Sequence, residues 1–376
     1  MIQRQLLQRL SQTVQNSKVT LLVGARQVGK TTLLKEMISQ SAINDVLWLN
    51  GDLPQVRATL ESNNLQEISL LIHNAKVVII DEAQRINAIG LTLKIIVDTM
   101  PDVKLFVTGS SAFELRNQLD EPLTGRKTTY YLYPISTQEL FETEGLIAVK
   151  ERLESRLIYG SYPEVITSNT PKDVLMELAG SYLFKDVLQV DGLRRANVLE
   201  KLLTALALQV GSEVNYNELS KTIGIDRKTV EKYIDILEKC YIIFHLNSFS
   251  RNIRTELTKG KKIYFYDIGI RNAILKQFAP LELRQDIGAL WENFFIAERM
   301  KYNHYRGQYV NTYFWRTTDK QEIDYIEEQD GELKLFELKW NPKKQNSRIP
   351  NVFLNTYHPN QTAIITRENY ITYLIL

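Results

Sequence analysis

The fold is decided by residues 24–31, whose sequence is GARQVGKT. This stretch follows the apolar run 19–23, which is typical of a buried strand, and a helical pattern begins at Thr31. The pattern G-x-x-x-x-G-K-T between a strand and a helix indicates a phosphate-binding loop. Glycines let the backbone wrap closely around phosphate oxygens, and the following helix turns its positive dipole end towards them. We therefore expect a nucleotide site here.

Four residues of this loop and the following Thr32 have expected roles. We expect Gly24 and Gly29 to shape the loop, and Lys30 to reach the β- and γ-phosphates. The hydroxyl of Thr31 is a candidate ligand of Mg²⁺, and Thr32 is a further candidate for contact with the nucleotide.

A second motif is the apolar run 77–80 followed by two acids, Asp81 and Glu82. An aspartate at the end of a buried strand can hold the Mg²⁺ of a nucleotide, which makes Asp81 a metal candidate. Glu82 is the candidate general base that polarises the attacking water.

Two further segments carry candidates for contact with the γ-phosphate. The run 103–107 ends in TGSS, where Ser110 or Thr108 would sense this phosphate; the alternative is a helix N-cap. Arg126 would stabilise transition-state charge in its own or a neighbouring subunit, or else would bind loop carbonyls. Arg26 is a weaker candidate for the same role.

The N-terminal third alternates short apolar runs with helical patterns, which predicts a parallel sheet covered on both faces. It resembles the AAA-type branch of P-loop ATPases, most of all a large prokaryotic ATPase family whose C-terminal domain was long of unknown function. The resemblance covers nearly the whole chain. It implies strand order 5-1-4-3-2, ATP and Mg²⁺ as cofactors, a TGSS sensor and a functional Gly125-Arg126 pair. The matching segments are GARQVGKTTLL, VVIIDEAQR, FVTGSS, LTGR, YLYPISTQEL and YGSYPEV.

Length and composition limit the number of domains and the kinds of site that the chain can contain. The chain has 376 residues, 44% hydrophobic and 24% charged, as expected of about two or three globular domains. Cys240 is the only cysteine, which excludes an internal disulfide. The formal net charge of +2 means that nucleic acid would have to bind at local basic patches. Because no membrane-spanning run and no secretion signal are visible, we expect a cytoplasmic protein without membrane contact.

The middle third is predicted to be mostly helical. Residues 151–186, broken near Gly160, suggest a small lid after the ATPase core. Two helices around the turn at Gly224 match a helix-turn-helix, and two extended runs, 241–246 and 261–266, suggest a wing. Two interpretations stay open: DNA binding, or a module that packs against protein and couples nucleotide state to its neighbour. The side chains expected to face DNA are Arg227, Lys228 and Lys232.

The C-terminal third contains a hairpin signal, Asp330-Gly331 between two β-prone runs. A two-residue turn there pairs 329 with 332 and places Asp324 opposite Glu337, with Lys339 on the same face. Facing carboxylates repel each other unless they are solvated or share a divalent cation, and a nearby lysine could position or activate the attacking water. The other face is expected to form a packed core of Ile323, Tyr325, Phe336, Leu338 and Trp340.

This arrangement resembles the core of the PD-(D/E)XK nuclease superfamily. The resemblance implies that Asp324 and Glu337 bind Mg²⁺ and that Lys339 assists hydrolysis. Glu292, in a helix that begins near Asp286, matches the helical acid of that fold and is a third metal candidate, with Glu298 as second choice. No Pro-Asp pair precedes the first acid, and the alternative is an inactive fold retained for binding.

These observations predict an α/β protein with three parts. They are an AAA-type P-loop ATPase domain (1–150), a helical lid and winged-helix module (151–275) and a PD-(D/E)XK nuclease-like domain (280–376). We expect ATP binding or turnover to control access of nucleic acid, with DNA favoured, to the carboxylate site. The alternatives are a nucleotide-dependent switch that binds DNA or protein without cleavage, and a regulatory ATPase whose C-terminal domain assembles homo-oligomers.

Overall fold

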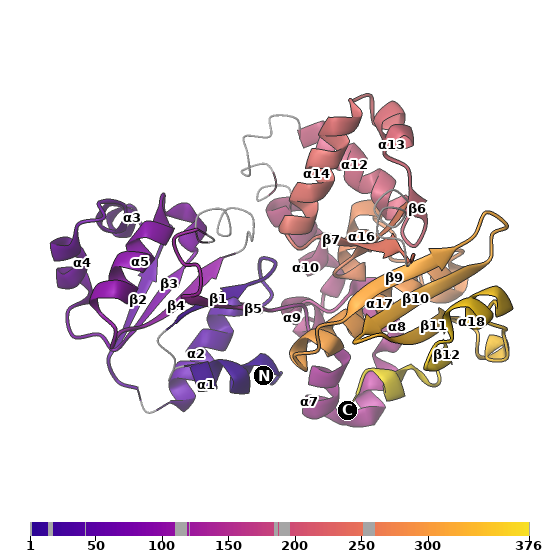
Figure 1. The fold of residues 1–376 in the computed structure, drawn as a ribbon, viewed down its shortest axis with the longest axis horizontal. Helices are drawn as coiled ribbons and strands as arrows, with labels where there is room; N and C mark the ends of the chain where they lie inside the picture. Colours follow the sequence, from indigo (N-terminus) through magenta and orange to yellow (C-terminus); the bar gives the residue numbers. More distant parts are fainter. Residues whose placement is uncertain are drawn as a thin grey trace. The chain divides into compact units, whose positions relative to one another are not determined.

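The computed structural model describes residues 2–13, 18–41, 43–109, 119, 121–183, 187, 196–250 and 260–375, with only the backbone for 181–183. The chain divides into two compact units (Figure 1). The first contains residues 3–133 and 239–241, and the second contains Ile2, 134–238 and 242–376. Among the described residues, no helix combines the length and apolar character needed to cross a membrane.

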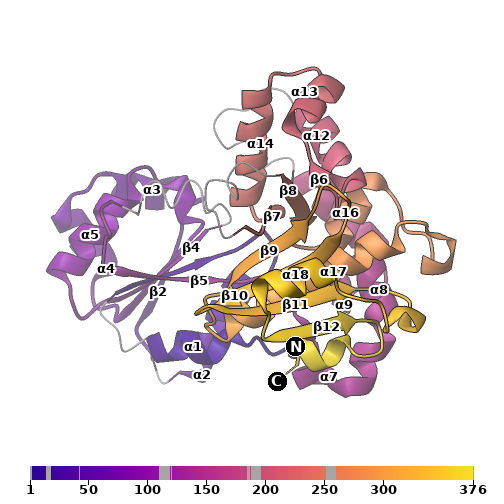
Figure 2. The same cartoon turned by 45° about the vertical axis from the view of Figure 1, so that its right-hand side comes forward.

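The first unit is built on a five-stranded parallel sheet with strand order β2-β3-β4-β1-β5. This confirms the order expected from the sequence, 5-1-4-3-2. Helices α1 and α2 cover one face and α3, α4 and α5 the other (Figure 2). The elements are α1 (Leu6–Thr13), β1 (Val19–Val23), α2 (Lys30–Gln40), β2 (Val46–Asn50), α3 (Pro54–Glu61), α4 (Leu65–Ile72), β3 (Val77–Asp81), α5 (Ile89–Thr99), β4 (Lys104–Gly109) and β5 (Lys127–Tyr131), with a 3₁₀ turn at Ala83–Arg85.

Burial explains why these runs form strands. Every residue of β1 and the first four of β3 are buried, as parallel strands covered on both faces require. All strands of a parallel sheet end at the same edge, so the loop after β1 and the acids after β3 lie together. The parallel arrangement of the strands thus brings the two predicted nucleotide-binding motifs together.

The second unit is built on a seven-stranded mixed sheet, in the order β12-β11-β10-β9-β7-β8-β6. Its helices are α7 (Thr137–Glu151), α8 (Leu153–Tyr159), α9 (Pro163–Thr167), α10 (Pro171–Glu177), α12 (Ala196–Leu208), α13 (Tyr216–Ile223), α14 (Arg227–Lys239), α16 (Ile268–Leu275), α17 (Ile287–Tyr305) and α18 (Asn351–Tyr357). Its strands are β6 (Glu213–Val214), β7 (Ile243–Ser248), β8 (Lys261–Phe265), β9 (Asn311–Arg316), β10 (Glu322–Gln329), β11 (Glu332–Leu338) and β12 (Gln361–Ile365). A π-helical segment spans Leu178–Leu183, and 3₁₀ turns span Leu281–Leu283, Pro342–Lys344 and Tyr370–Tyr373.

The observed units differ from the predicted division. The first unit ends at Tyr133, so α7, which the sequence assigned to the ATPase domain, belongs to the second unit. Strands on both sides of the predicted boundary near residue 280 join one sheet, because β7 pairs in parallel with β9 through Asn247 and Tyr313. The middle and C-terminal segments therefore share a sheet.

The C-terminal hairpin has the predicted turn and register. Gln329 pairs with Glu332 and Tyr325 pairs with Phe336. The pairing of β10 with β9 shifts between Ile323 and Ile326, which marks a β-bulge. One extra residue reverses the direction of the side chains, so the predicted place of Ile323 beside Tyr325 is wrong.

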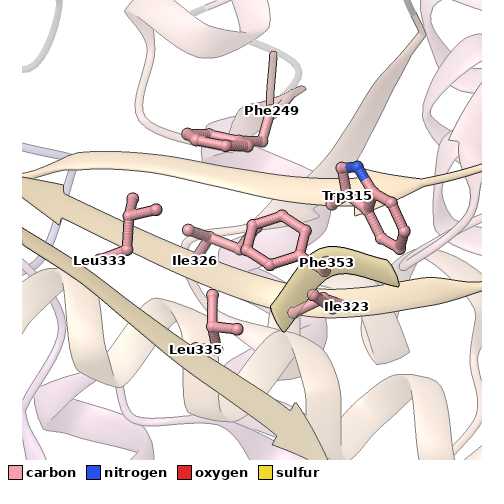
Figure 3. Packing of buried hydrophobic residues seen from close by; sticks show 7 residues of the cluster. All are labelled: Phe249, Trp315, Ile323, Ile326, Leu333, Leu335 and Phe353. Carbon is pink, nitrogen blue, oxygen red and sulfur yellow. The ribbon is translucent and has the colours of Figure 1, made fainter. Parts of the chain in front are cut away.

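The observed place of Ile323 is in an apolar cluster on the α18 side of the sheet (Figure 3). The cluster contains Phe249, Trp315, Ile323, Ile326, Leu333, Leu335 and Phe353. The opposite face packs against α17, where Phe295 contacts Phe336. The sheet is thus enclosed between α17 and α18, which fixes the strands that carry the acidic residues.

Candidate functional site

The loop after β1 has the shape that phosphate binding requires. Gly29 precedes α2 with a φ of 96°, a left-handed conformation that favours glycine. At Gly24, an added Cβ would lie 2.1 Å from the carbonyl oxygen of Leu132, so no larger residue fits there. Both glycines of the motif are therefore explained by backbone geometry.

Lys30 lies over this loop. Its ammonium donates hydrogen bonds of 2.9 Å to the carbonyl oxygens of Gly24 and Ala25, and the residue is only 6% exposed. The predicted Thr32 is exposed on the first turn of α2. The only charged side chain of the G-K-T triplet is thus held where a phosphate group would meet the loop.

The two predicted metal candidates of this unit come together. Thr31 Oγ1 donates a hydrogen bond of 2.8 Å to Asp81 Oδ2, although β1 and β3 are separated by β4 in the sheet. A hydroxyl and a carboxylate oxygen are hard donors that suit Mg²⁺. These residues fit a nucleotide-bound Mg²⁺.

Thr108 completes the acidic end of β3. Its hydroxyl donates to Asp81 Oδ1 and accepts from the backbone N–H of Glu82, 3.3 Å away. The backbone of Glu82 has a φ of 53°, which turns the chain sharply after the strand. Of the two hydroxyls considered at this position, Thr108 is in contact with Asp81, and Ser110 lies outside the described residues.

Arg126 lies at the wrong edge of the sheet to act on its own phosphate loop. Its carbonyl oxygen accepts from the N–H of Val19, the first residue of β1, whereas the loop follows the last residue. Five residues of strand separate the two edges by about 16 Å. Its guanidinium pairs with Asp98 at 3.1 Å. This position does not favour a role at the phosphate loop of its own subunit.

Arg4 supports the loop, although the sequence does not predict this role. Its guanidinium donates to the carbonyl oxygens of Val28 (2.7 Å) and Tyr133 (2.6 Å), and the residue is buried. The contacts join residues 24 and 129 positions apart. No local sequence pattern predicts a contact between residues so far apart. An arginine at the start of an apolar helical segment is only a weak indication of a buried contact.

A second cluster of charged residues lies at the end of the C-terminal hairpin. Lys339 Nζ is 2.6 Å from Glu337 Oε1 and 3.5 Å from Asp324 Oδ2. Asp324 Oδ2 also accepts from the N–H of Leu338, at 2.8 Å. The three residues predicted to act together are therefore in contact.

Glu337 has an incompletely satisfied carboxylate. Burial and the neighbouring charge of Asp324 raise the pKa of Glu337 to about 7. Its second oxygen, Oε2, is buried without a hydrogen-bond partner. An unpartnered carboxylate oxygen beside a second carboxylate fits a hard divalent cation, which is often bound by one or two carboxylates together with water and phosphate.

The predicted set of three acidic metal ligands is not formed. Among the residues described, no group of three or more His, Cys, Asp or Glu side chains is arranged to hold a metal ion. Glu292 instead accepts hydrogen bonds from Lys262 Nζ (3.1 Å) and Tyr264 Oη (2.6 Å). Burial raises the pKa of Glu292, against the opposing effect of Lys262.

Glu298, the second choice for the helical acid, lies elsewhere on α17. Its carboxylate pairs with Lys301 (2.6 Å) and Arg156 (3.1 Å), and it accepts from the N–H and hydroxyl of Thr137. These partners are all buried. Glu298 therefore joins α7, α8 and α17 and has no part in the carboxylate cluster.

The predicted helix-turn-helix consists of α13 and α14, joined at Gly224, whose φ is 79°. Arg227, Lys228 and Lys232 are exposed on α14. Arg227 forms an ion pair of 2.8 Å with Glu231 on the same helix. Residues 251–259, between the two runs expected to form a wing, lie outside the described residues.

Comparison with protein families agrees with the geometry of the first unit. Residues 16–141 match a family model described as an AAA domain. This part of the chain is thus similar to an AAA-type P-loop ATPase domain. Residues 150–281 and 287–374 match two models described as domains of unknown function, DUF8612 and DUF4143.

Similar proteins are known in distant prokaryotes. The chain is 28% identical over 344 residues to an uncharacterized protein of Mycobacterium tuberculosis, covering 88% of this chain and 72% of the relative. It is 25% identical to an uncharacterized protein of Haemophilus influenzae, covering 98% and 91%. Among solved structures, a signal transduction ATPase with numerous domains from Pyrococcus horikoshii has a TM-score of 0.29 and 14% identity, with coverage of 82% of this chain and 48% of that one.

Proposed function

We propose that the chain hydrolyses ATP at the phosphate loop and that its second unit cleaves DNA under the control of ATP. The ATPase part rests on the AAA domain match and on the contact between Thr31 and Asp81. The observation that carries the nuclease part is the convergence of Asp324, Glu337 and Lys339, with one carboxylate oxygen left unpartnered.

The roles follow from position. Lys30 would bind the β- and γ-phosphates, Thr31 and Asp81 would hold Mg²⁺, and Glu82 would take a proton from the attacking water. Arg126 lies far from its own loop and would act on the nucleotide of a neighbouring subunit. This would require a homo-oligomer.

In the second unit, Asp324 and Glu337 would hold a divalent cation, which when bound stabilises the negative charge that develops on the attacked phosphate. Lys339 would hold the attacking water by a hydrogen bond. The water oxygen would bond to phosphorus and lose a proton to solvent. The bond from phosphorus to the leaving sugar oxygen would break, and that oxygen would take up a proton from solvent. Binding of DNA is supported by the element order of α12 to β8, which is that of a winged helix, and by exposed basic residues on α14.

A cleavage assay tests this proposal. Purified full-length protein is incubated with supercoiled plasmid and Mg²⁺ or Mn²⁺, with and without ATP. Asp324→Ala should abolish cleavage, whereas Asp319→Ala, which removes an exposed acid from the neighbouring loop, should not. ATP dependence of the wild-type rate would establish coupling between the units.

The alternative is a nucleotide-dependent switch that binds DNA or protein without cleavage. It is supported by the ion pairs of Lys339, which occupy both carboxylates. If ATP is hydrolysed but plasmid stays intact under every condition, the switch replaces the nuclease. Fluorescence anisotropy with labelled duplex DNA at increasing salt would then measure binding through Lys228 and Lys232.

A further inference from the structure

Lys262 is an unusual feature of the second unit. It is 1% exposed and belongs to β8, in the middle segment of the chain, yet its ammonium lies among acids of the C-terminal segment. It forms ion pairs with Glu292 and Glu322, and its Nζ lies 5.4 Å from the ring centroid of Phe314. A buried ammonium is costly unless acids pair with it, so Lys262 and these two acids depend on each other.

One oxygen of the Glu292 carboxylate is already satisfied by protein groups. Its Oε1 accepts from Lys262 and from Tyr264, which are two residues apart on β8 and so lie on the same face of the strand. Its Oε2 faces the turn at Gly211, where an added Cβ would lie 3.3 Å away. Little coordination capacity is therefore left for a metal ion on Oε1 of this carboxylate.

Glu322 is satisfied in the same way. Besides Lys262, it has Arg316 as a partner, at 3.9 Å on the neighbouring strand. The half of the cluster formed by Glu292 and Glu322 is therefore neutralised by cationic side chains of the protein.

The other half of the cluster is different. Asp324 and Glu337 carry two carboxylates and share one ammonium, that of Lys339. Glu337 Oε2 is the only carboxylate oxygen among these acids that is fully buried without a partner in the described part of the chain. This half of the cluster, and not the surroundings of Lys262, thus has a buried carboxylate oxygen left for an additional cation.

We infer that Lys262 takes the place of a second metal ion, so that the cluster has a single divalent-cation position, at Asp324 and Glu337. This rests on the proposed function, because it specifies the metal content of the same site. Lys262 and Tyr264 are then positioning residues that hold Glu292 beside the metal without making it a ligand.

Counting Mn²⁺ ions tests this inference without reference to cleavage. Electron paramagnetic resonance of free Mn²⁺ gives the number of ions bound to the full-length chain without nucleotide, and Asp81→Asn, measured in parallel, corrects for an ion at the phosphate loop. We expect one remaining ion. Glu337→Gln should weaken its binding at least about tenfold, the lower range for lost metal-site interactions. Glu292→Gln should leave its Kd within about threefold of the wild type.

Other results have distinct meanings. Two ions in the second unit, one of them lost in Glu292→Gln, would overturn the single-cation inference and leave a metal-dependent nuclease intact. A Glu292→Gln defect as large as that of Glu337→Gln would also overturn it. No bound ion at any Mn²⁺ concentration would overturn the proposed nuclease and this inference together. Lys262→Met, if it folds, should admit a second ion, and an unchanged count of one would contradict the role of Lys262.

Discussion

The hydroxyl of Thr31 donates a 2.8 Å hydrogen bond to Asp81, which joins the helix after β1 to the end of β3. The two residues are 50 positions apart and approach because β1 and β3 end at the same edge of the parallel sheet. A substitution in either motif therefore affects the other motif. Each contact of the nucleotide site is best tested by a separate variant.

Lys30→Ala should lower the rate of ATP hydrolysis at least about 100-fold, since it removes the positive charge that meets the phosphates. Circular dichroism should show an intact fold. Lys35→Ala, on an exposed position of the same helix, should hydrolyse ATP at the wild-type rate. Normal turnover in Lys30→Ala would show that the loop has another function.

Thr108→Val should lower ATP hydrolysis about tenfold and leave nucleotide binding largely intact. Valine keeps the shape of the buried side chain but removes the hydrogen bond to Asp81, and one lost buried hydrogen bond corresponds to about 1–3 kcal/mol. Thr92→Val is the matched control, because Thr92 is also buried and bonds to Leu60 away from the site. Equal rates in the two variants would refute a role for the hydroxyl of Thr108.

Arg126→Ala should not alter ATP hydrolysis at protein concentrations where the chain is monomeric. The residue lies at the edge of the sheet opposite the phosphate loop, and its exposed pair with Asp98 adds little stability. Asp98→Ala, which releases the same arginine, is the control. A defect that appears only when mass measurements show an oligomer would assign Arg126 to a neighbouring subunit, and a defect in the monomer would contradict its observed place.

Arg4→Met should lower the free energy of unfolding by about 2 kcal/mol, because it leaves the carbonyl oxygens of Val28 and Tyr133 without this donor. It should also weaken ATP binding, since Val28 belongs to the phosphate loop. Urea unfolding and titration with a fluorescent ATP analogue measure the two effects. Arg9→Met, which loses the stacking of Arg9 on Tyr130, should leave ATP binding unchanged.

Glu298→Gln should reduce the acid sensitivity of the fold. Burial alone would raise the pKa of Glu298, but Lys301 and Arg156 outweigh it and lower the pKa from 4.5 to about 2. A depressed folded-state pKa stabilises the protein above the unfolded value, and this stability is lost as the pH falls from about 4.5 to about 2. The shift corresponds to about 3 kcal/mol.

Urea unfolding of the wild type and Glu298→Gln between pH 7 and pH 2 measures this contribution. The variant should be less stable at pH 7, and the difference between the two proteins should shrink towards pH 2. Glu164→Gln, at an exposed position, should follow the wild type throughout. A constant difference at all pH values would exclude titration of Glu298 as the cause.

The sequence predicts the approach of Thr31 to Asp81, because both residues lie at the ends of strands of one parallel sheet. Lys30 and Asp81 each belong to a short motif whose structural context is local, and the strand order was implied by a family resemblance. The place of Arg126 could not be predicted, because its neighbours in sequence do not reveal which edge of the sheet it reaches. The sheet pairing of Lys127 with Val19 decides that question, and such pairing is a long-range property.

In the carboxylate cluster, the turn at Asp330-Gly331 specified the register, so the approach of Asp324 to Glu337 could be predicted. The bulge before Ile326 could not, because it depends on how β10 meets β9. Lys262 was also beyond prediction, since it comes from β8, 30 residues before Glu292. The sequence therefore predicted the acidic residues of this cluster but not Lys262, the cation that pairs with Glu292.

The parallel pairing of β7 with β9 limits how the gene for this protein can be rearranged. Separating the middle from the C-terminal segment would leave each with an unpaired strand edge, which invites aggregation. A gene fusion or deletion that exchanges one segment must therefore supply a strand able to complete the other. The two segments are expected to fold cooperatively and to be transmitted together, although family models divide them near residue 281.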